Sequence, residues 1–317
     1  MWRFIIRHKV FFIAVLSLLL IKMLWVTWAC WGNGSPDDEK NDLLQRKNYL
    51  VGKIIVEPRQ LLNEMPGGLG LQFQGEWALY SCSMLAEALS NMADLYPETK
   101  DDAIDTIDSL IQIVKSPELR LYDKVRWNED PLESLNGDKS HVSYLSHLAW
   151  MIGNYRRIGG DNKYKQLHDS VCEAMNRRIQ QSPILNIPTY PDEPIYVPDM
   201  MVALVALSDY ARLNNGKYSS TVKDWICRAK SEWVDDKTGL IVSVLDDNMQ
   251  MEADKRFLCS TQLLLSNPDR CGICQGTIRQ IKDTFPSVLS GYRYQRILRP
   301  FVLAWYGYRC RSDNSES

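Results

Sequence analysis

The sequence predicts an all-α protein, an α/α toroid with inner and outer rings of helices, preceded by an N-terminal transmembrane helix. Three observations lead to this fold class. Helical patterns that are apolar on nearly every side alternate along the chain with patterns that carry one apolar stripe, which is typical of buried and surface helices. The connections alternate between short and long. No strand-rich region occurs, although residues 239–245 fit a short hairpin arm.

The N-terminal segment predicts a membrane anchor. Residues 10–31 form an apolar run interrupted by Lys22, and about 20 residues span a bilayer core. Three basic residues precede the run and the first acidic residue is Asp37, so residues 1–9 are expected in the cytoplasm and the rest in the periplasm. A lipoprotein modified at Cys30 and a cleaved signal peptide are the alternatives, and both also export the domain.

The remainder of the chain predicts one large domain. We expect a polar linker over residues 32–42, the toroid over 43–310 and a polar tail over 311–317. The 317 residues are 45% hydrophobic and 24% charged, which excludes a disordered or collagen-like protein. After the first 33 residues, 33 basic residues face 39 acidic ones, and this balance disfavours nucleic acid as a partner.

The expected helices follow one another as inner and outer elements, after a first helix within 43–62. The inner ones lie at 77–95, 141–155 and 199–213, and the outer ones at 101–114, 162–179 and 219–233. Segments 252–265, 277–285 and 300–309 continue the series. The run from Met200 to Leu207 is apolar throughout and therefore predicts a buried helix.

The long connections predict where a site would lie. Inner-to-outer links are short, whereas the outer-to-inner links 115–140, 180–198 and 234–251 are long. In a toroid these long loops gather at the end where the inner helices begin, and long ordered loops tend to be functional. Exposed N–H groups at the helix starts favour negatively charged groups there.

Candidate residues for chemistry converge on this mouth. The candidates for acid–base catalysis are Glu76, Tyr80, His141, His147 and Asp199. The candidates for substrate binding are Trp77, Trp127, Tyr144, Tyr190, Tyr196 and Asp246. Carboxylates, histidines and aromatic rings suit a neutral small molecule or saccharide. Each candidate has a structural alternative, in which the acids cap helices and the histidines pack in the core.

No metal or cofactor is expected. His141 and His147 lack a recognisable third ligand, and a lone pair of ligands does not make a zinc site. Outside the apolar run there are seven cysteines, an odd number that leaves at least one thiol unpaired. The single CxxC motif, Cys271 to Cys274, has neither a second pair nor a nearby histidine, so a local disulfide or core thiols are expected.

Five short segments resemble bacterial proteins with a linalool dehydratase/isomerase-like domain. They are GEWALY at 75–80, YLSHL at 144–148, GGDNKY at 159–164, PTYPDE at 188–193 and Pro198-Asp199. The likeness extends over about 68–247. It implies an α/α barrel and cofactor-free hydration, dehydration and isomerisation of a small isoprenoid alcohol, with Tyr80, His147 and Asp199 lining the pocket. That chemistry also uses cysteines near the pocket, and residues 180–198 contain none.

These observations leave three function classes open. The first is an exported, cofactor-free acid–base enzyme of the lyase, isomerase or hydro-lyase type. The second is a carbohydrate-active enzyme (a glycoside hydrolase, lyase or epimerase), because a fold of this kind does not fix a function. The third is a noncatalytic module that binds a glycan or a partner. An enzyme requires at least one pair of candidate side chains within hydrogen-bond reach in a cleft.

Overall fold

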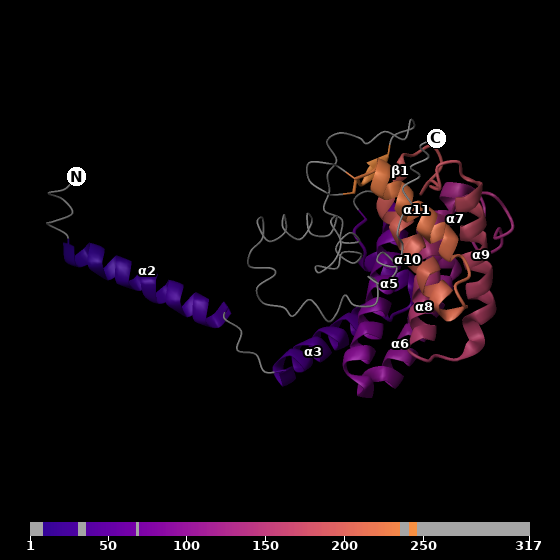
Figure 1. Cartoon of the computed structure of the whole chain (residues 1–317). Helices are drawn as coiled ribbons and strands as arrows, with labels where there is room; N and C mark the ends of the chain where they lie inside the picture. The colour runs from indigo at the N-terminus through magenta and orange to yellow at the C-terminus, as the bar shows by residue number, and fades with distance from the viewer. Residues whose placement is uncertain (1–8, 31–35, 68–69, 235–240, 246–317) are drawn as a thin grey trace.

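The computed structural model describes residues 9–30, 36–67, 70–234 and 241–245, and this part of the chain is mostly helical (Figure 1). Its α-helices are α2 (Lys9–Cys30), α3 (Pro36–Ile54), α4 (Pro58–Glu64), α5 (Leu71–Leu95), α6 (Lys100–Lys115), α7 (Pro117–Trp127), α8 (Val142–Arg157), α9 (Lys165–Gln181), α10 (Val197–Leu213) and α11 (Ser219–Glu232). Short 3-10 helices, η1 (Pro97–Thr99) and η2 (Asn162–Tyr164), precede α6 and α9. The expected helices 252–265, 277–285 and 300–309, the tail and Asp246 lie outside the described residues.

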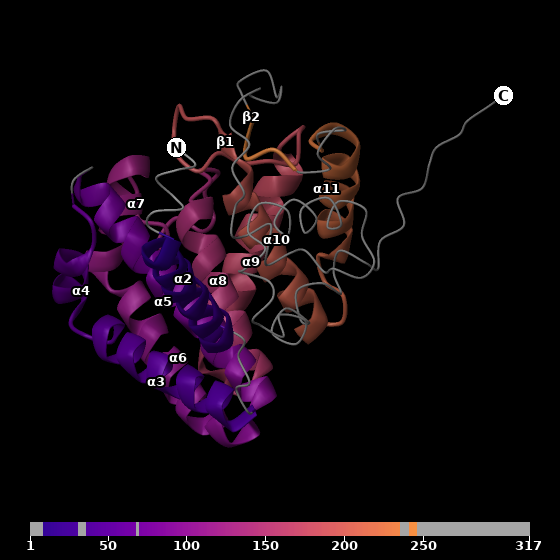
Figure 2. The same ribbon diagram turned by 90° about the vertical axis from the view of Figure 1, so that its left-hand side faces the viewer.

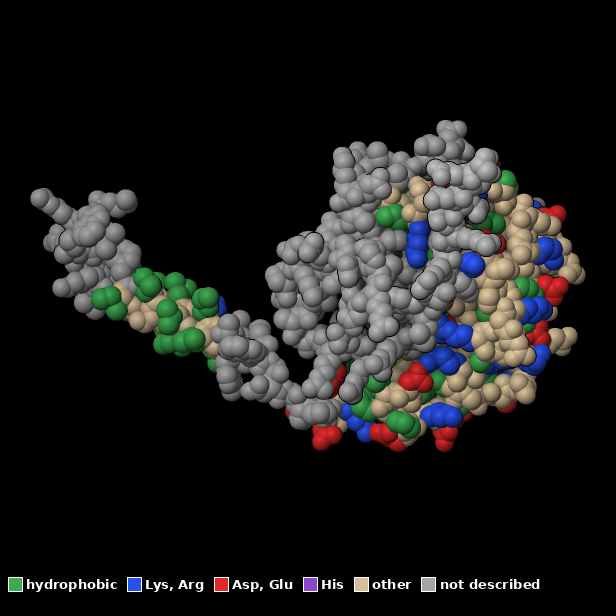
Figure 3. Space-filling view, viewed as in Figure 1, with side chains coloured by type: hydrophobic (Ala, Val, Ile, Leu, Met, Phe, Trp, Pro, Cys, Tyr) green, Lys and Arg blue, Asp and Glu red, His purple; other side chains and the backbone are tan. Residues whose placement is uncertain are grey.

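Helix α2 covers most of the predicted anchor and extends away from the helical body (Figure 1). Its large apolar side chains are exposed, among them Leu18 and Trp25, and hydrophobic side chains make up much of the surface of α2 seen in Figure 3. Among the residues that the structure describes, no helix combines the length and apolar character needed to cross a membrane. The anchor over 10–31 therefore stays a prediction.

Residues 36–42 of the predicted linker belong to helix α3, which begins at Pro36. Proline suits the first turn of a helix, where its missing N–H has no partner to lose. Asp37, Asp38 and Glu39 follow it in the same turn, where carboxylates interact favourably with the helix dipole. The polar residues that indicated a linker therefore form the first turn of a helix.

The core is built around α8, which packs against α5 on one side and α10 on the other. Every residue from Val142 to Tyr155 of α8 is buried. The apolar run from Met200 to Leu207 in α10 is also buried, as predicted. Helix α5 is less enclosed than its composition predicts, since Trp77 is 49% and Met84 46% exposed.

The helices with a single apolar stripe lie outside this core, as their patterns predict. Helix α6 packs on α5, α9 on α8, and α11 on α10 and α9 (Figures 1 and 2). In α6 the stripe that includes Ile107, Leu110 and Val114 is buried, while Asp101 and Asp105 are exposed. On the face of the body shown in Figure 3, acidic and basic side chains are interspersed.

The predicted loop 115–140 was partly wrong, because its first half forms α7. The Ser116 hydroxyl caps this helix by accepting a hydrogen bond from the Leu119 amide, and Pro117 occupies the first turn. The helix ends at Trp127 and is followed by Asn128, whose φ of 53° is left-handed. Leu119, Tyr122 and Trp127 are buried, so α7 packs beside α5 rather than crossing the surface as a loop.

A two-stranded antiparallel pairing joins the long loop before α10 to the segment that follows α11. Strand β1 (Ile195–Tyr196) pairs with β2 (Val244–Leu245), and an isolated bridge links Val234 to Ile241. Within the expected hairpin arm 239–245, Val244 and Leu245 form a strand, but their partner is β1 and not a strand of the same segment. This pairing ties the end of the loop, three residues before Asp199, to the segment after α11; β1 and β2 lie side by side in Figure 2.

Candidate active site

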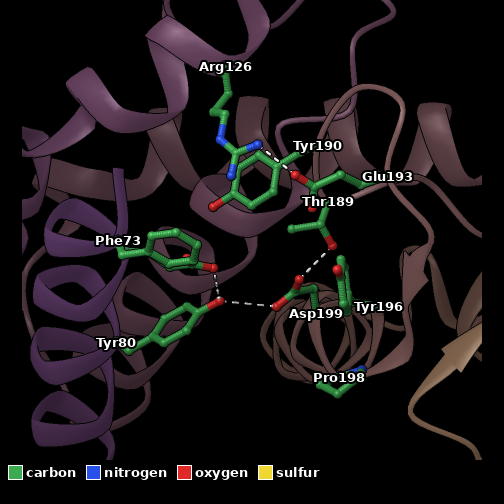
Figure 4. A pocket seen from close by; sticks show the side chains of 10 residues that line it. Phe73, Tyr80, Arg126, Thr189, Tyr190, Glu193, Tyr196, Pro198 and Asp199 are labelled. Atoms are coloured by element: carbon green, nitrogen blue, oxygen red, sulfur yellow. Dashed lines mark hydrogen bonds and ion pairs between the residues drawn. The ribbon is translucent and has the colours of Figure 1, made fainter. Parts of the chain in front are cut away.

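A cavity of about 510 Å³ lies where α5 and α10 begin, which is the end predicted for the site. Figure 4 shows the side chains that surround it. They come from α5, from the end of α7 and from the loop and first turn leading into α10. The lining residues are Phe73, Glu76, Tyr80, Arg126, Thr189, Tyr190, Glu193, Tyr196, Pro198 and Asp199.

Two carboxyl groups meet at one phenolic hydroxyl at the base of the cavity. The Tyr80 hydroxyl lies 2.8 Å from Glu76 Oε1 and 3.4 Å from Asp199 Oδ1 (Figure 4). Glu76 and Tyr80 are one turn apart on α5, so both side chains leave the same helix face. Asp199 reaches them from the first turn of α10. A phenol has one proton, so both contacts are hydrogen bonds only when one carboxyl group is itself protonated.

The environment favours a shared proton in this trio. Burial raises the pKa of Asp199 to about 6, and the nearby charge of Glu76 adds to the increase, while hydrogen bonds from Thr189 and Tyr80 oppose it. Burial also raises the pKa of Glu76, against the opposing effects of the Tyr80 hydrogen bond and the Arg126 charge. The pKa of Tyr80 lies well above its ordinary value because its ring is buried beside both acids. The phenol therefore stays protonated near neutral pH.

Asp199 is fixed at both of its oxygens. The Thr189 hydroxyl donates to Oδ2 at 2.6 Å, and the Tyr80 hydroxyl lies at Oδ1. Thr189 is 2% and Asp199 8% exposed. The α10 helix start and the preceding loop thus hold the carboxyl group toward the cavity from two directions.

A charged pair occupies the opposite side of the cavity. Arg126 Nη1 donates to Glu193 Oε1 at 2.6 Å, and the guanidinium group lies 4.3 Å from the centre of the Tyr190 ring. The Tyr190 hydroxyl lies 3.4 Å from the Ser143 hydroxyl oxygen, which anchors the ring to α8. Arg126 comes from α7 and Glu193 from the loop, so the pair links two elements across the rim.

Four of the predicted site residues line the cavity with Asp199, namely Glu76, Tyr80, Tyr190 and Tyr196. His147 lies just behind them: its ring centre is 4.6 Å from that of Tyr80, and its Nδ1 atom is 2.7 Å from the Ser83 hydroxyl oxygen. Burial lowers the pKa of His147 to about 3. It therefore supports the Tyr80 ring as a neutral imidazole.

The other predicted residues lie away from the cavity lining. His141 sits between carboxyl oxygens of Asp123, at 2.5 Å, and Glu129, at 3.1 Å. The Trp127 ring packs near His141, and Tyr144 is fully buried with its hydroxyl bonded to the Val114 carbonyl oxygen.

Trp77 lies on an exposed part of α5, with its ring edge toward Tyr80. The three-residue spacing of His141, Tyr144 and His147 predicted one shared helix face, but His141 precedes α8 as its N-cap residue. The side chains of Tyr144 and His147 are buried, with partners at Val114 and Ser83.

Five further lining residues were not among the predicted site residues, and one of them, Pro198, directly precedes Asp199. In the sequence, Arg126 and Glu193 are charged residues of two expected loops. The sequence could not show that they form an ion pair, because they are 67 positions apart. Thr189 directly precedes Tyr190, a predicted site residue. Phe73 was missed because the first inner helix was expected to begin at Trp77, whereas α5 begins at Leu71.

Among the described residues, no group of three or more His, Cys, Asp or Glu side chains is placed to hold a metal ion. Cys82 and Cys172 are buried free thiols, and Cys227 is disulfide-bonded. Comparison of the sequence with protein-family models and with curated proteins found no match.

Proposed function

We propose that the protein is a cofactor-free acid–base enzyme of the lyase or isomerase type that acts on a small hydroxylated molecule in this cavity. The observation that carries the proposal is the Tyr80 hydroxyl between Glu76 and Asp199. Neighbouring acids whose pKa values are pushed apart by their environments can act as base and acid in one turnover. Burial raises the pKa of both acids; the Arg126 charge opposes this rise at Glu76, whereas the Glu76 charge adds to it at Asp199, so Glu76 is the better base and Asp199 the better acid.

The proposed step is an elimination. Glu76 accepts a proton from a substrate carbon while Asp199 donates its proton to the hydroxyl group on the adjacent carbon. The C–H and C–O bonds break, a carbon–carbon double bond forms, and water leaves. The Tyr80 hydroxyl then passes a proton from Glu76 back to Asp199, which restores the starting state without an external acid. Proton transfer by positioned groups of this kind typically contributes about 10²–10⁴-fold to the rate.

A carbohydrate-active hydrolase is the second candidate, because two carboxyl groups that flank one bond are also the apparatus of glycoside hydrolysis. The resemblance to linalool dehydratase/isomerase-like domains favours the elimination. The two reactions differ in the fate of water, which is released in the elimination and consumed in the hydrolysis.

A ligand screen followed by isotope labelling tests the proposal. Ligands are first found by their stabilisation of the folded protein, and each is then incubated with the protein in D₂O and in H₂¹⁸O. Elimination releases water and forms a carbon–carbon double bond, and its reversal in D₂O puts deuterium on the carbon that lost its proton. Asp199→Asn should abolish the release of water. Hydrolysis puts ¹⁸O into a sugar product. A ligand that binds with neither label nor turnover would identify a noncatalytic binding module.

The closed α/α toroid and the extracytoplasmic location belong to the same proposal. The alternation of buried and striped helices supports the toroid. The basic flank before the apolar run supports export. The disulfide at Cys227 also supports export, because disulfides persist in oxidising compartments.

A further inference from the structure

We propose that the ligand of this cavity is a neutral saccharide, and that Arg126 and Glu193 recognise its hydroxyl groups. This inference rests on the proposed function and specifies its substrate class. It starts from the distribution of polar groups around the cavity. Figure 4 shows the Tyr80 and Asp199 side chains on one side and the Arg126–Glu193 pair on the other, with Tyr190 and Thr189 between them.

The charges in the cavity disfavour an anionic ligand. Among the ten described residues that line it, Arg126 is the one cation, and Glu193 already neutralises it at 2.6 Å. A carboxylate or phosphate would therefore face Glu76 and Asp199 without a free positive partner. Like charges placed together in a partly buried site are costly.

The rim pair also disfavours a ligand with a single hydroxyl group. Such a molecule can occupy the acid–base trio, but its hydrocarbon part would then cover Arg126 and Glu193, whose side chains are 22% and 29% exposed. Covering these groups removes the water that satisfies their remaining donors and acceptors, and buried polar groups without partners are unfavourable. A polyhydroxylated ring can form hydrogen bonds with the acid–base residues on one side of the cavity and with Arg126 and Glu193 on the other at the same time.

The remaining lining suits the apolar faces of such a ring. The side chains of Phe73 and Tyr196 border the cavity, as does Pro198. Flat aromatic side chains provide rigid contact area for the C–H faces of a pyranose. One face of the Tyr190 ring is covered by Arg126, which keeps the guanidinium group in place for hydrogen bonding.

Calorimetric titration of the full-length protein tests this inference. The ligand panel contains the neutral sugars methyl glucoside, N-acetylglucosamine and cellobiose, the anionic sugar glucuronic acid, and linalool as a single-hydroxyl alcohol. We expect at least one neutral sugar to bind, and glucuronic acid and linalool to bind at least tenfold more weakly. Failure of all neutral sugars to bind a folded sample would overturn the proposal.

Variants of the rim pair test the recognition itself. Arg126→Gln and Glu193→Gln should each weaken sugar binding by about tenfold or more, because each removes charge-assisted hydrogen bonds. Lys124→Gln, an exposed position on the same helix that does not line the cavity, should leave binding unchanged. Circular dichroism confirms that each variant is folded, and unchanged binding by folded Arg126→Gln and Glu193→Gln would exclude their role.

The outcomes separate this inference from the proposed function. If linalool binds more tightly than every sugar and acquires deuterium, the acid–base proposal stands and the saccharide proposal fails. If a sugar binds through the rim pair but acquires no label and is not converted, the saccharide proposal stands and the enzymatic one fails.

Discussion

At the scale of single residues, the site depends on one hydroxyl group and the two acids around it. The residue types and their helical spacing predicted Glu76, Tyr80 and Asp199 as candidates, because apolar patterns placed them at helix starts. The pattern could not show that Tyr80 stands between the acids, since this contact joins residues 119 positions apart. Nor could it separate His147, which supports Tyr80, from His141, which is bound by Asp123 and Glu129.

The Asp199→Asn substitution tests the acid. Asparagine can accept from Thr189 and donate to the Tyr80 oxygen, so the fold should be kept and the free energy of unfolding should change by no more than about 1 kcal/mol. Loss of the ionisable proton should lower turnover of the identified substrate by about a hundredfold or more. The matched control is Asp192→Asn, which lies on the preceding loop with a φ of 60°, a conformation that asparagine adopts readily. Full turnover by Asp199→Asn would remove Asp199 from the mechanism.

A second buried acid, Glu87, predicts a pH dependence of stability. Glu87 is 4% exposed, and only one of its oxygens has a hydrogen-bond partner among the described residues, Asn91 at 2.8 Å. Burial raises its pKa from 4.5 to about 8, and the charge of Asp209 adds to this while that of Arg157 opposes it. Between these two values the folded state holds a proton that the unfolded chain has lost, so stability should fall as the pH rises through this window.

Urea unfolding at pH 6 and pH 9 measures this effect. The Glu87 contribution should lower the free energy of unfolding by about 2–3 kcal/mol over that interval, at about 1.4 kcal/mol per pKa unit. Glu87→Gln keeps an acceptor for Asn91 and removes the titration, so its stability should depend less on pH. Equal pH dependence in both proteins would show that Glu87 does not titrate in this range.

At the scale of helices and strands, the sequence predicted helix limits well where one helical period of apolar residues continues through the whole segment. Helices α6, α8, α10 and α11 begin and end within about two residues of their predicted limits. The prediction failed at α7, where the Ser-Pro start was overlooked among many polar residues. The β1–β2 pairing was also missed, because two-residue strands carry no periodicity and their partners are distant in sequence.

The approach of α5 to α7 gives a prediction at this scale. A Cβ atom added at Gly75 would lie 2.7 Å from the Tyr122 side chain. Gly75→Ala should therefore separate the helices beside Glu76 and cost about 1–3 kcal/mol of stability. Gly52→Ala in α3 is the matched control, since a Cβ atom there meets nothing within 4 Å and alanine favours helix by up to about 1 kcal/mol. Thermal unfolding of both variants should show opposite signs; a stabilised Gly75→Ala would contradict the close approach.

At the scale of the whole molecule, the sequence predicted a helical protein and the end at which the cavity lies. Both follow from burial patterns and connection lengths, which are properties of the chain as a whole. The size of the cavity and the other half of its lining were beyond prediction, because they depend on how α5, α7 and α10 are angled around the loop that carries Thr189. Those angles arise from contacts between distant residues.

The topology gives the prediction at this scale. If residues 10–31 anchor the chain with the N-terminus inside, protease added to intact spheroplasts should remove the helical domain and leave the first residues protected. The reporter is an antibody tag after residue 317, with a cytoplasmic protein as the control for cell integrity. Complete protection of the tagged domain in intact spheroplasts, followed by digestion after lysis, would place the domain in the cytoplasm.

The loop that closes the cavity has its own attachments to the body. The Trp225 indole N–H donates to Asn186 at 2.8 Å, Arg228 donates to the Pro183 carbonyl oxygen at 2.7 Å, and β1 pairs with β2. The helices hold Glu76, Tyr80 and Asp199, whereas the loop supplies Glu193. In the proposed function, Glu193 of the recognition pair is therefore encoded in this loop, apart from the acid–base residues, while Arg126 comes from α7. Proteins with the same helices could therefore bind other ligands after substitutions in this loop alone, with the acid–base residues unchanged. Transfer of the loop from one such protein to another should also transfer the ligand preference.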